Sequence, residues 1–179
     1  MKYNSIILSG LPGAGKSTLI KFLEEELHWK VFGAGDLWRA RWKIWKKESL
    51  EHQLDFPEYW KNTSKEDNIK MNEEIRTLAE RGNIILDSRY SAHYCKDLPS
   101  LRIFLYAGIA TRAQRSSESK NFKIARAELV RRETDELSMA KQLYGDSYDY
   151  RTPTEYHLCL NSQELTPEQE LKAILSCLK

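Results

Sequence analysis

One glycine-rich segment near the start of the chain has the residue types and spacing needed to hold a phosphate group. Residues 10–17 read Gly-Leu-Pro-Gly-Ala-Gly-Lys-Ser, which is a complete P-loop. Glycines allow backbone N–H groups to turn inward around a phosphate without a Cβ in the way. In such a loop we expect Lys16 to reach the β- and γ-phosphates of ATP, and Ser17 to hold Mg²⁺ through its hydroxyl. The residues predicted to bind ATP here are Gly10, Pro12, Gly13, Ala14, Gly15, Lys16, Ser17 and Thr18.

The segments on either side of the loop have the pattern that a P-loop requires. Residues 6–8 form an apolar run typical of a buried parallel strand, and after the loop Leu19, Ile20, Leu23 and Leu27 recur at helical spacing. The loop therefore lies between a strand and a helix, whose N-terminus adds the positive end of its dipole. This context favours nucleotide binding over a glycine-rich turn that binds nothing.

Two carboxylates and two arginines follow other predicted strands. The apolar strand 83–87 ends in Asp87, and Arg89 follows it. Asp36 follows the predicted strand 29–32, and we expect it to cap a helix that carries Arg39 or to accept a hydrogen bond near the substrate. Ligands of parallel sheets bind beyond the carboxyl ends of the strands, so these residues and the P-loop should form one site. Asp87 is predicted to bind Mg²⁺ directly or through water.

Arginines suit the transfer of a phosphoryl group, because catalysis of this reaction depends on positioning and on neutralising charge. Arg39 and Arg89 are the strongest candidates, since each lies beside a predicted loop of the site. Arg112, Arg131 and Arg132 lie on predicted helices, where a solvated surface charge is an equally good interpretation.

The order of the predicted elements indicates an α/β fold. Strands alternate with helices, which is typical of a parallel sheet covered on both faces. We therefore expect a three-layer P-loop sandwich with about five parallel strands, forming a single domain over residues 1–179. The predicted strands cover residues 6–8, 29–32, 83–87, 101–106 and 156–160, and helices begin after residues 16, 36, 65, 111, 123 and 166.

Composition excludes several classes of protein. Of the 179 residues, 41% are hydrophobic and 30% are charged, which indicates a globular chain. A net charge of +2 gives no reason to expect nucleic-acid binding over the whole surface, and no apolar stretch is long enough to span a membrane. The three cysteines have no metal-type spacing. We expect a cytoplasmic monomer.

Four segments beyond the P-loop resemble the short archaeal cytidylate kinases, within the nucleoside monophosphate kinases. Residues 33–39 are similar to the family's Ser-Ala-Gly-Asp-x-x-Arg segment, and residues 87–89 to its Glu-Gly-Arg. Residues 128–145 resemble the lid helix followed by Tyr-Gly. The closing Tyr-Asp-Leu-Val-Ile-Asn-Thr and Ser-Pro-Glu-Glu segments are similar to residues 156–162 and 166–168.

The resemblance implies a role for each part of the chain. A helical insert over about residues 36–81 would bind the acceptor nucleotide, and a lid over about residues 115–145 would close over ATP and exclude water. Arg39 and Arg89 would hold the acceptor phosphate, Arg132 would act from the lid, and Arg112 would contact ATP. The residues predicted to bind the acceptor are Asp36, Arg39, Asn68, Asn72, Asp87 and Arg89.

Two departures from the family pattern bear on activity. An acidic pair on the acceptor-binding helix is replaced by Asn68 and Asn72, and an amide presents different donors and acceptors from a carboxylate. A lid arginine is replaced by Met139 or its neighbour Ser138, although Arg131 could substitute for it. The first departure leaves the accepted base open, and the second leaves catalytic strength open.

One helix carries three tryptophans at positions 38, 42 and 45, which fall on one helical face among basic residues. This face could stack the bases of a larger substrate such as an RNA end. It could also pack the helix onto the body of the domain, and we favour packing.

The sequence therefore predicts an ATP- and Mg²⁺-dependent phosphotransferase acting on small nucleotides, with CMP or dCMP as the expected acceptor. An acceptor phosphate is already ionised at neutral pH, so no strong base is needed. Two alternatives stay open. The acceptor could be a hydroxyl of a nucleoside, another small molecule or an RNA end, with Asp36 or Asp87 as base. The chain could also be a nucleotide-binding regulatory protein with weak transfer.

Overall fold

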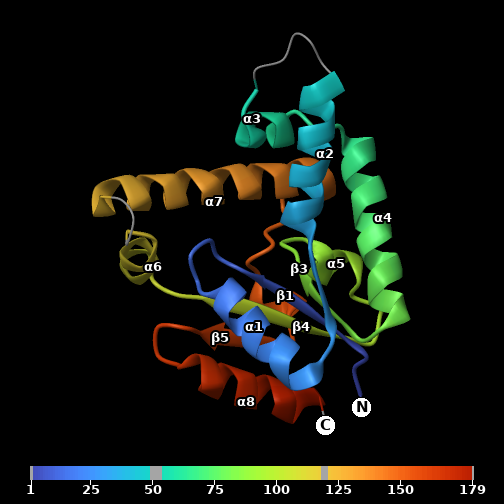
Figure 1. Cartoon of the computed structure of the whole chain (residues 1–179), viewed down its shortest axis with the longest axis vertical. Coiled ribbons are helices and arrows are strands. Elements are labelled where there is room, and N and C mark those ends of the chain that lie inside the picture. Colours follow the sequence, from blue (N-terminus) through green and yellow to red (C-terminus); the bar gives the residue numbers. More distant parts are fainter. Residues whose placement is uncertain (1, 49–53, 118–120, 179) are drawn as a thin grey trace.

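Five parallel strands form one sheet in the order β2-β3-β1-β4-β5 (Figure 1). The computed structural model of the chain describes residues 2–48, 54–117 and 121–178. Each neighbouring pair of these strands is parallel. The strands are β1 (Ser5–Gly10), β2 (Lys30–Gly33), β3 (Ile84–Asp87), β4 (Ser100–Tyr106) and β5 (Leu158–Asn161). The predicted α/β fold is confirmed.

Helices α1 (Lys16–Leu27) and α8 (Pro167–Leu178) lie side by side against one face of the sheet (Figure 1). Every residue of β1 is buried, as expected for a central strand covered on both sides. Side chains alternate across a strand, so Ile6 and Leu8 pack with α1 and α8, whereas Ile7 packs into the core on the opposite face.

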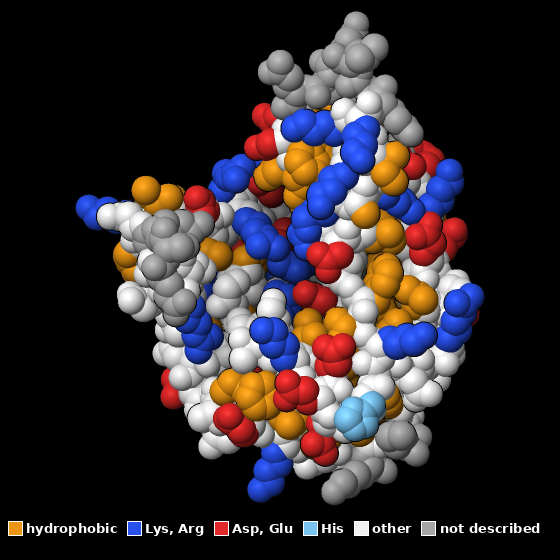
Figure 2. Space-filling view, in the orientation of Figure 1, with side chains coloured by type: hydrophobic (Ala, Val, Ile, Leu, Met, Phe, Trp, Pro, Cys, Tyr) orange, Lys and Arg blue, Asp and Glu red, His pale blue; other side chains and the backbone are white. Residues whose placement is uncertain are grey.

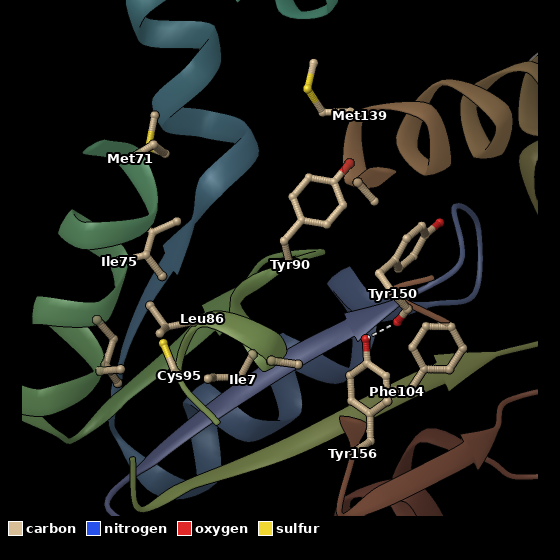
Figure 3. Packing of buried hydrophobic residues seen from close by; sticks show 14 of the residues in the cluster. Ile7, Met71, Ile75, Leu86, Tyr90, Cys95, Phe104, Met139, Tyr150 and Tyr156 are labelled. Atoms are coloured by element: carbon tan, nitrogen blue, oxygen red, sulfur yellow. Dashed lines mark hydrogen bonds between the residues drawn. The ribbon is translucent and has the colours of Figure 1, made fainter. Parts of the chain in front are cut away.

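The core on this opposite face, called the second core below, contains many of the buried aromatic side chains. It joins Ile7 and Leu86 of the sheet to Met71 and Ile75 of α4 (Lys65–Arg81) (Figure 3). Tyrosines fill the side nearest α7 (Phe122–Tyr144), and Tyr156 donates a hydrogen bond of 2.5 Å from its hydroxyl to the backbone oxygen of Tyr150. The core therefore anchors α4 and α7 above the sheet.

The remaining helices connect the strands or flank the sheet. They are α2 (Ala34–Glu48), α3 (Phe56–Lys61), α5 (Ser91–Tyr94), α6 (Ile109–Ser116) and a 3-10 turn (Pro153–Glu155). In Figure 1, α2 continues upward from the end of β2, α3 lies beside α2 at the top, and α7 crosses the molecule below α3, whereas α4 runs alongside the sheet. None of the helices in the described residues is both long and apolar enough to cross a membrane.

Some predicted boundaries were wrong. Helix α2 begins at Ala34, so Asp36 lies within its first turn and is not its N-cap. No helix was predicted between residues 48 and 65, but α3 lies there, and Asp55 accepts a hydrogen bond of 2.9 Å from the backbone N–H of Glu58. Residues 49–53 of that stretch lie outside the described residues. The short helix α5 was also missed.

Trp38 packs α2 onto the body of the domain, as we favoured, whereas Trp42 and Trp45 are half-buried and pack against α3. Trp38 is buried in the second core. Trp42 meets the ring of Phe56 edge-on at 6.0 Å, and Trp45 lies 5.0 Å from the ring of Tyr59. Aromatic pairs at such distances add to the stabilisation from burial. These contacts hold α3 against α2.

Candidate functional site

The P-loop joins β1 to α1 and needs glycine for steric reasons. Gly10 has a φ of +149°, and a Cβ there would lie 2.2 Å from the backbone oxygen of Leu105. Gly13 and Gly15 also have positive φ values, of +76° and +97°. Gly15 is the N-cap of α1 and offers no side chain to the first N–H groups of the helix. Those groups are therefore available to an anion.

Lys16 is buried within the P-loop. Its Nζ donates to the backbone oxygens of Gly10 at 3.2 Å and Leu11 at 3.3 Å. Burial lowers the pKa of Lys16 from 10.5 to about 7, the positive charge of Arg89 adds to this effect, and Asp87 opposes it. The ammonium group of Lys16 is therefore close to Arg89 and Asp87, two of the charged residues predicted for the site.

Asp87 ends β3 and lies in register with Leu8 of β1 and Gly33 of β2. Its Oδ1 is buried and accepts no hydrogen bond from any described residue. A buried carboxylate oxygen without a partner is costly, and a bound cation would satisfy it. Magnesium prefers oxygen ligands and commonly takes one or two from the protein and others from phosphates. Asp87 and the exposed hydroxyl of Ser17 therefore fit Mg²⁺.

A cavity of about 360 Å³ opens between α2, α3, α4, α7 and the end of β3. Figure 2 shows lysine and arginine side chains gathered around the hollow at the centre of this face. Six predicted site residues line the cavity, namely Arg39, Asn68, Asn72, Asp87, Arg89 and Arg132. Apolar side chains complete its wall, among them Trp38, Phe56, Trp60, Met71 and Ile75. Asp36 is not among the lining residues; its carboxylate is exposed and pairs with Arg39 at 2.5 Å.

The two cavity asparagines are buried on α4, and both are oriented by hydrogen bonds. Asn68 donates from Nδ2 to the hydroxyl of Thr63 and to the backbone oxygen of Ser64, each at 2.9 Å. Asn72 donates from Nδ2 to the hydroxyl of Tyr144 at 2.8 Å. Since a backbone oxygen can only accept, the amide of Asn68 must present its nitrogen to Ser64 and its oxygen elsewhere.

Arg112 was predicted to contact ATP, and the structure gives its side chain a different set of partners. It is 3% exposed. Its Nε donates to the backbone oxygen of Ala107 at 2.8 Å, and its Nη1 donates to the backbone oxygen of Pro12 at 3.0 Å and to Glu133 at 2.6 Å. Arg112 therefore supports the P-loop from behind and connects it to α7.

The two residues expected to replace a lid arginine lie in different environments. Met139 is buried in the second core, whereas Ser138 is exposed. Arg131 lines the cavity beside Arg132, so a neighbouring arginine is present on the same helix.

Sequence analysis missed Glu136, which is buried at the centre of the site. It accepts from Arg89 Nε at 2.8 Å and from Arg132 Nε at 2.9 Å. The only sequence signal was its spacing of four residues from Arg132, which is equally typical of an exposed ion pair on a charged helix.

A second cavity, of about 180 Å³, was also not predicted. It lies against the P-loop and is lined by Ala14, Gly15, Thr18, Arg115, Ser162, Leu165, Pro167 and Glu170. Arg115 donates to the backbone oxygen of Ser162 at 2.6 Å, which fixes its guanidinium at the wall.

Comparison with known proteins identifies the family of the chain. The profile of the cytidylate kinase-like family matches residues 5–164. A cytidylate kinase of Methanobrevibacter smithii is 31% identical over 176 residues, covering 97% of this chain and 98% of that protein. A cytidylate kinase of Sulfurisphaera tokodaii is 28% identical over 176 residues, covering 94% of this chain and 92% of that protein.

Among solved structures, a shikimate kinase from Bacteroides thetaiotaomicron has a TM-score of 0.57 at 15% identity, with 97% of each chain covered. At this identity the likeness is one of fold. The family profile, in contrast, spans the chain from the first residue of β1 to the turn that follows β5. The chain therefore belongs to the cytidylate kinase-like family.

Proposed function

We propose that the protein transfers the γ-phosphoryl group of ATP to the phosphate of a cytosine nucleotide, CMP or dCMP. Its family makes it a phosphotransferase of the nucleoside monophosphate kinase type. The observation that carries the choice of acceptor is the orientation of Asn68 on the wall of the larger cavity.

The P-loop is the site for the triphosphate. Lys16 and the first N–H groups of α1 bind the β- and γ-phosphates, and the smaller cavity beside Gly15 and Thr18 lies within reach of the rest of the nucleotide. Asp87 and Ser17 would hold Mg²⁺, directly or through water. When bound, this ion neutralises charge on the phosphates and orients them.

The larger cavity is the site for the acceptor. Arg39, Arg89 and Arg132 border it and supply positive charge for the acceptor phosphate. In this proposal residues 36–81 are the acceptor-binding insert and residues 115–145 the lid. Because the acceptor phosphate is ionised at neutral pH, the residues need only align it with the γ-phosphate and exclude water.

Asn68 supports a base that carries an amino group. Its amide hydrogens are used within α4 and the preceding turn, so its Oδ1 is the group left for the cavity that it lines. An amide oxygen accepts a hydrogen bond from the N4 amino group of cytosine and repels the O4 carbonyl of uracil. Adenine also carries an amino group, and the family favours cytosine over adenine.

The test is the release of ADP from ATP and Mg²⁺ with CMP, dCMP, UMP, dTMP, AMP and GMP as acceptors. We expect CMP and dCMP to give the highest kcat/KM. Asn68→Ala should lower kcat/KM for CMP by about 10- to 100-fold and reduce the preference over UMP, because the lost hydrogen bond is worth about 1–3 kcal/mol.

Thr77→Ala is the matched control, because Thr77 is exposed on the same helix and, among the described residues, its hydroxyl bonds only to the backbone of Glu73. It should behave as wild type. A preference for UMP, or a preference for CMP that survives in Asn68→Ala, contradicts the proposed base recognition. If none of the nucleotides stimulates ADP release although ATP still binds, the result favours a hydroxyl acceptor, with Asp87 as base, or a regulatory role.

A further inference from the structure

We propose that Glu136 is a positioning residue that sets the guanidinium groups of Arg89 and Arg132 so that both converge on the phosphate of the acceptor. This inference rests on the proposed function, since it assigns the acceptor phosphate to the larger cavity. It adds a role for a residue of α7 that holds the two cations in place without itself contacting the substrate.

One carboxylate joins two arginines from distant parts of the chain. Arg89 follows β3, and Arg132 lies one turn before Glu136 on α7. Glu136 Oε2 accepts from Arg89 Nε at 2.8 Å, and Oε1 accepts from Arg132 Nε at 2.9 Å. Each carboxylate oxygen therefore fixes a different guanidinium group.

Both arginines use only Nε in this arrangement. Within the part of the chain that the structure describes, no group accepts a hydrogen bond from the Nη atoms of Arg89 or Arg132. A guanidinium group is planar and rigid, so a bond at Nε sets the direction of its terminal fork. Both residues line the cavity, and their forks are therefore available to one anion.

The charges explain why a carboxylate is needed at this position. Arg89 and Arg132 both lie close enough to Lys16 to affect it electrostatically, and like charges repel. Burial favours the neutral form of Glu136, but Arg89 and Arg132 outweigh it and lower the pKa of the carboxyl group. An ionised Glu136 thus offsets part of the positive charge before a phosphate binds.

Two tyrosines hold Glu136 itself. The hydroxyl of Tyr150 donates to Oε2 at 3.2 Å, and the hydroxyl of Tyr90 donates to the backbone oxygen of Glu136 at 2.7 Å. Both rings lie in the core near Met139 of α7 (Figure 3). The carboxylate therefore lies on a rigid support, which is what a positioning residue requires.

The experiment compares two ligands that differ only in the phosphate. Titration of the full chain with CMP and with cytidine, followed by the fluorescence of the cavity tryptophans or by calorimetry, gives a Kd for each. For Glu136→Gln we expect the Kd of CMP to rise by about tenfold or more, because a neutral amide cannot accept from both arginines. The Kd of cytidine should change by less than about twofold, because the base site is untouched.

Glu136→Asp provides a second variant if the glutamine protein folds poorly. It keeps the charge but shortens the side chain by one methylene, so it should raise the Kd of CMP selectively and to a smaller extent. Lys141→Gln is the control, a single charge change at an exposed position of the same helix, and it should leave both constants unchanged. Equal weakening of CMP and cytidine, or no weakening of CMP, overturns the proposal.

The outcomes also separate this inference from the proposed function. If wild-type protein does not phosphorylate CMP, titration with inorganic phosphate still tests the role of Glu136. Selective loss of phosphate affinity in Glu136→Gln would then support the positioning role while the proposed acceptor fails. Normal phosphorylation of CMP by Glu136→Gln, with an unchanged KM for CMP, would reject the positioning role alone.

Discussion

Lys16 illustrates how a single buried charge couples binding to pH. Water cannot reach its ammonium group easily, and Arg89 adds repulsion, so its pKa lies near 7 instead of 10.5. The two backbone oxygens that it contacts carry only partial charge. A triphosphate carries full negative charges and would restore the preference for the protonated form.

We therefore predict that ATP binding takes up protons above neutral pH. At pH 8 much of Lys16 is neutral in the free protein and becomes charged in the complex, so uptake should approach about one proton per ATP. At pH 6 the residue is already charged and uptake should largely vanish. Calorimetric titration with ATP and saturating Mg²⁺, in two buffers of different ionisation enthalpy, measures the number of protons taken up per ATP bound.

Lys21→Met, at an exposed position of α1, should keep the wild-type proton uptake. Equal uptake at pH 6 and pH 8 would show that Lys16 is not the group that titrates.

At the scale of elements, the P-loop is held by the helices behind it. Arg112 of α6 contacts Pro12 of the loop, Ala107 at the end of β4 and Glu133 of α7. Its side chain is 4% exposed and that of Glu133 is 18% exposed, so the pair is largely shielded from water. The P-loop and α7 are thus joined through one guanidinium group.

We predict that Arg112→Met raises the KM for ATP by about tenfold, because the loop loses its support at Pro12, and changes the KM for CMP little. Stability should fall by about 3 kcal/mol, because Glu133 is left partly buried without a partner. Steady-state kinetics and denaturant unfolding measure the two effects.

The double variant Arg112→Met/Glu133→Gln should recover much of the stability but not the KM for ATP. Arg126→Met, at an exposed position of α7, should change neither quantity. A normal KM for ATP in Arg112→Met would show that Arg112 stabilises the fold without contributing to ATP binding.

At the scale of the whole molecule, the two faces of the sheet are packed differently. The face toward α1 and α8 is almost entirely aliphatic, whereas the opposite face is rich in tyrosine and supports the cavity. Glu170 is an exception on the aliphatic side: it is 3% exposed, and no hydrogen bond to its carboxylate comes from the described residues. Burial raises the pKa of this group from 4.5 to about 7, although Arg115 opposes the shift.

This shift predicts a pH-dependent cost to stability. The folded state keeps a proton on Glu170 that the unfolded state loses, so the contribution of Glu170 to stability falls as pH rises from about 4.5 to about 7 and stays low above that. Glu170→Gln should therefore raise the melting temperature at pH 8 and change it little at pH 4.5. Thermal unfolding across this pH range measures the difference.

The control is Glu168→Gln, because Glu168 is exposed on the first turn of the same helix. It should not raise the melting temperature at pH 8. If Glu170→Gln raises the melting temperature equally at all pH values, the stabilisation comes from packing and not from removal of the charge.

Local sequence patterns were sufficient for the five strands, the longer helices and the P-loop, but not for the short helices α3 and α5. The P-loop is contiguous, and its glycines, lysine and flanking apolar residues specify backbone geometry over a few residues. Apolar runs and helical spacing placed the five strands and the main helices, because burial on a sheet face or helix face repeats with a short period. Helix starts were less certain, since Asp36 suits both a cap and a first turn.

The sequence by itself determined the fold class, the P-loop and the family resemblance, because each depends on neighbouring residues or on short repeats. Only the tertiary structure decided what the charged residues contact. Glu136 meets Arg89 across 47 positions of sequence, and Arg112 turns to Pro12 across 100. Such contacts depend on how α7 and α6 pack against the sheet edge, and helical spacing alone cannot separate a buried charge from a solvated one.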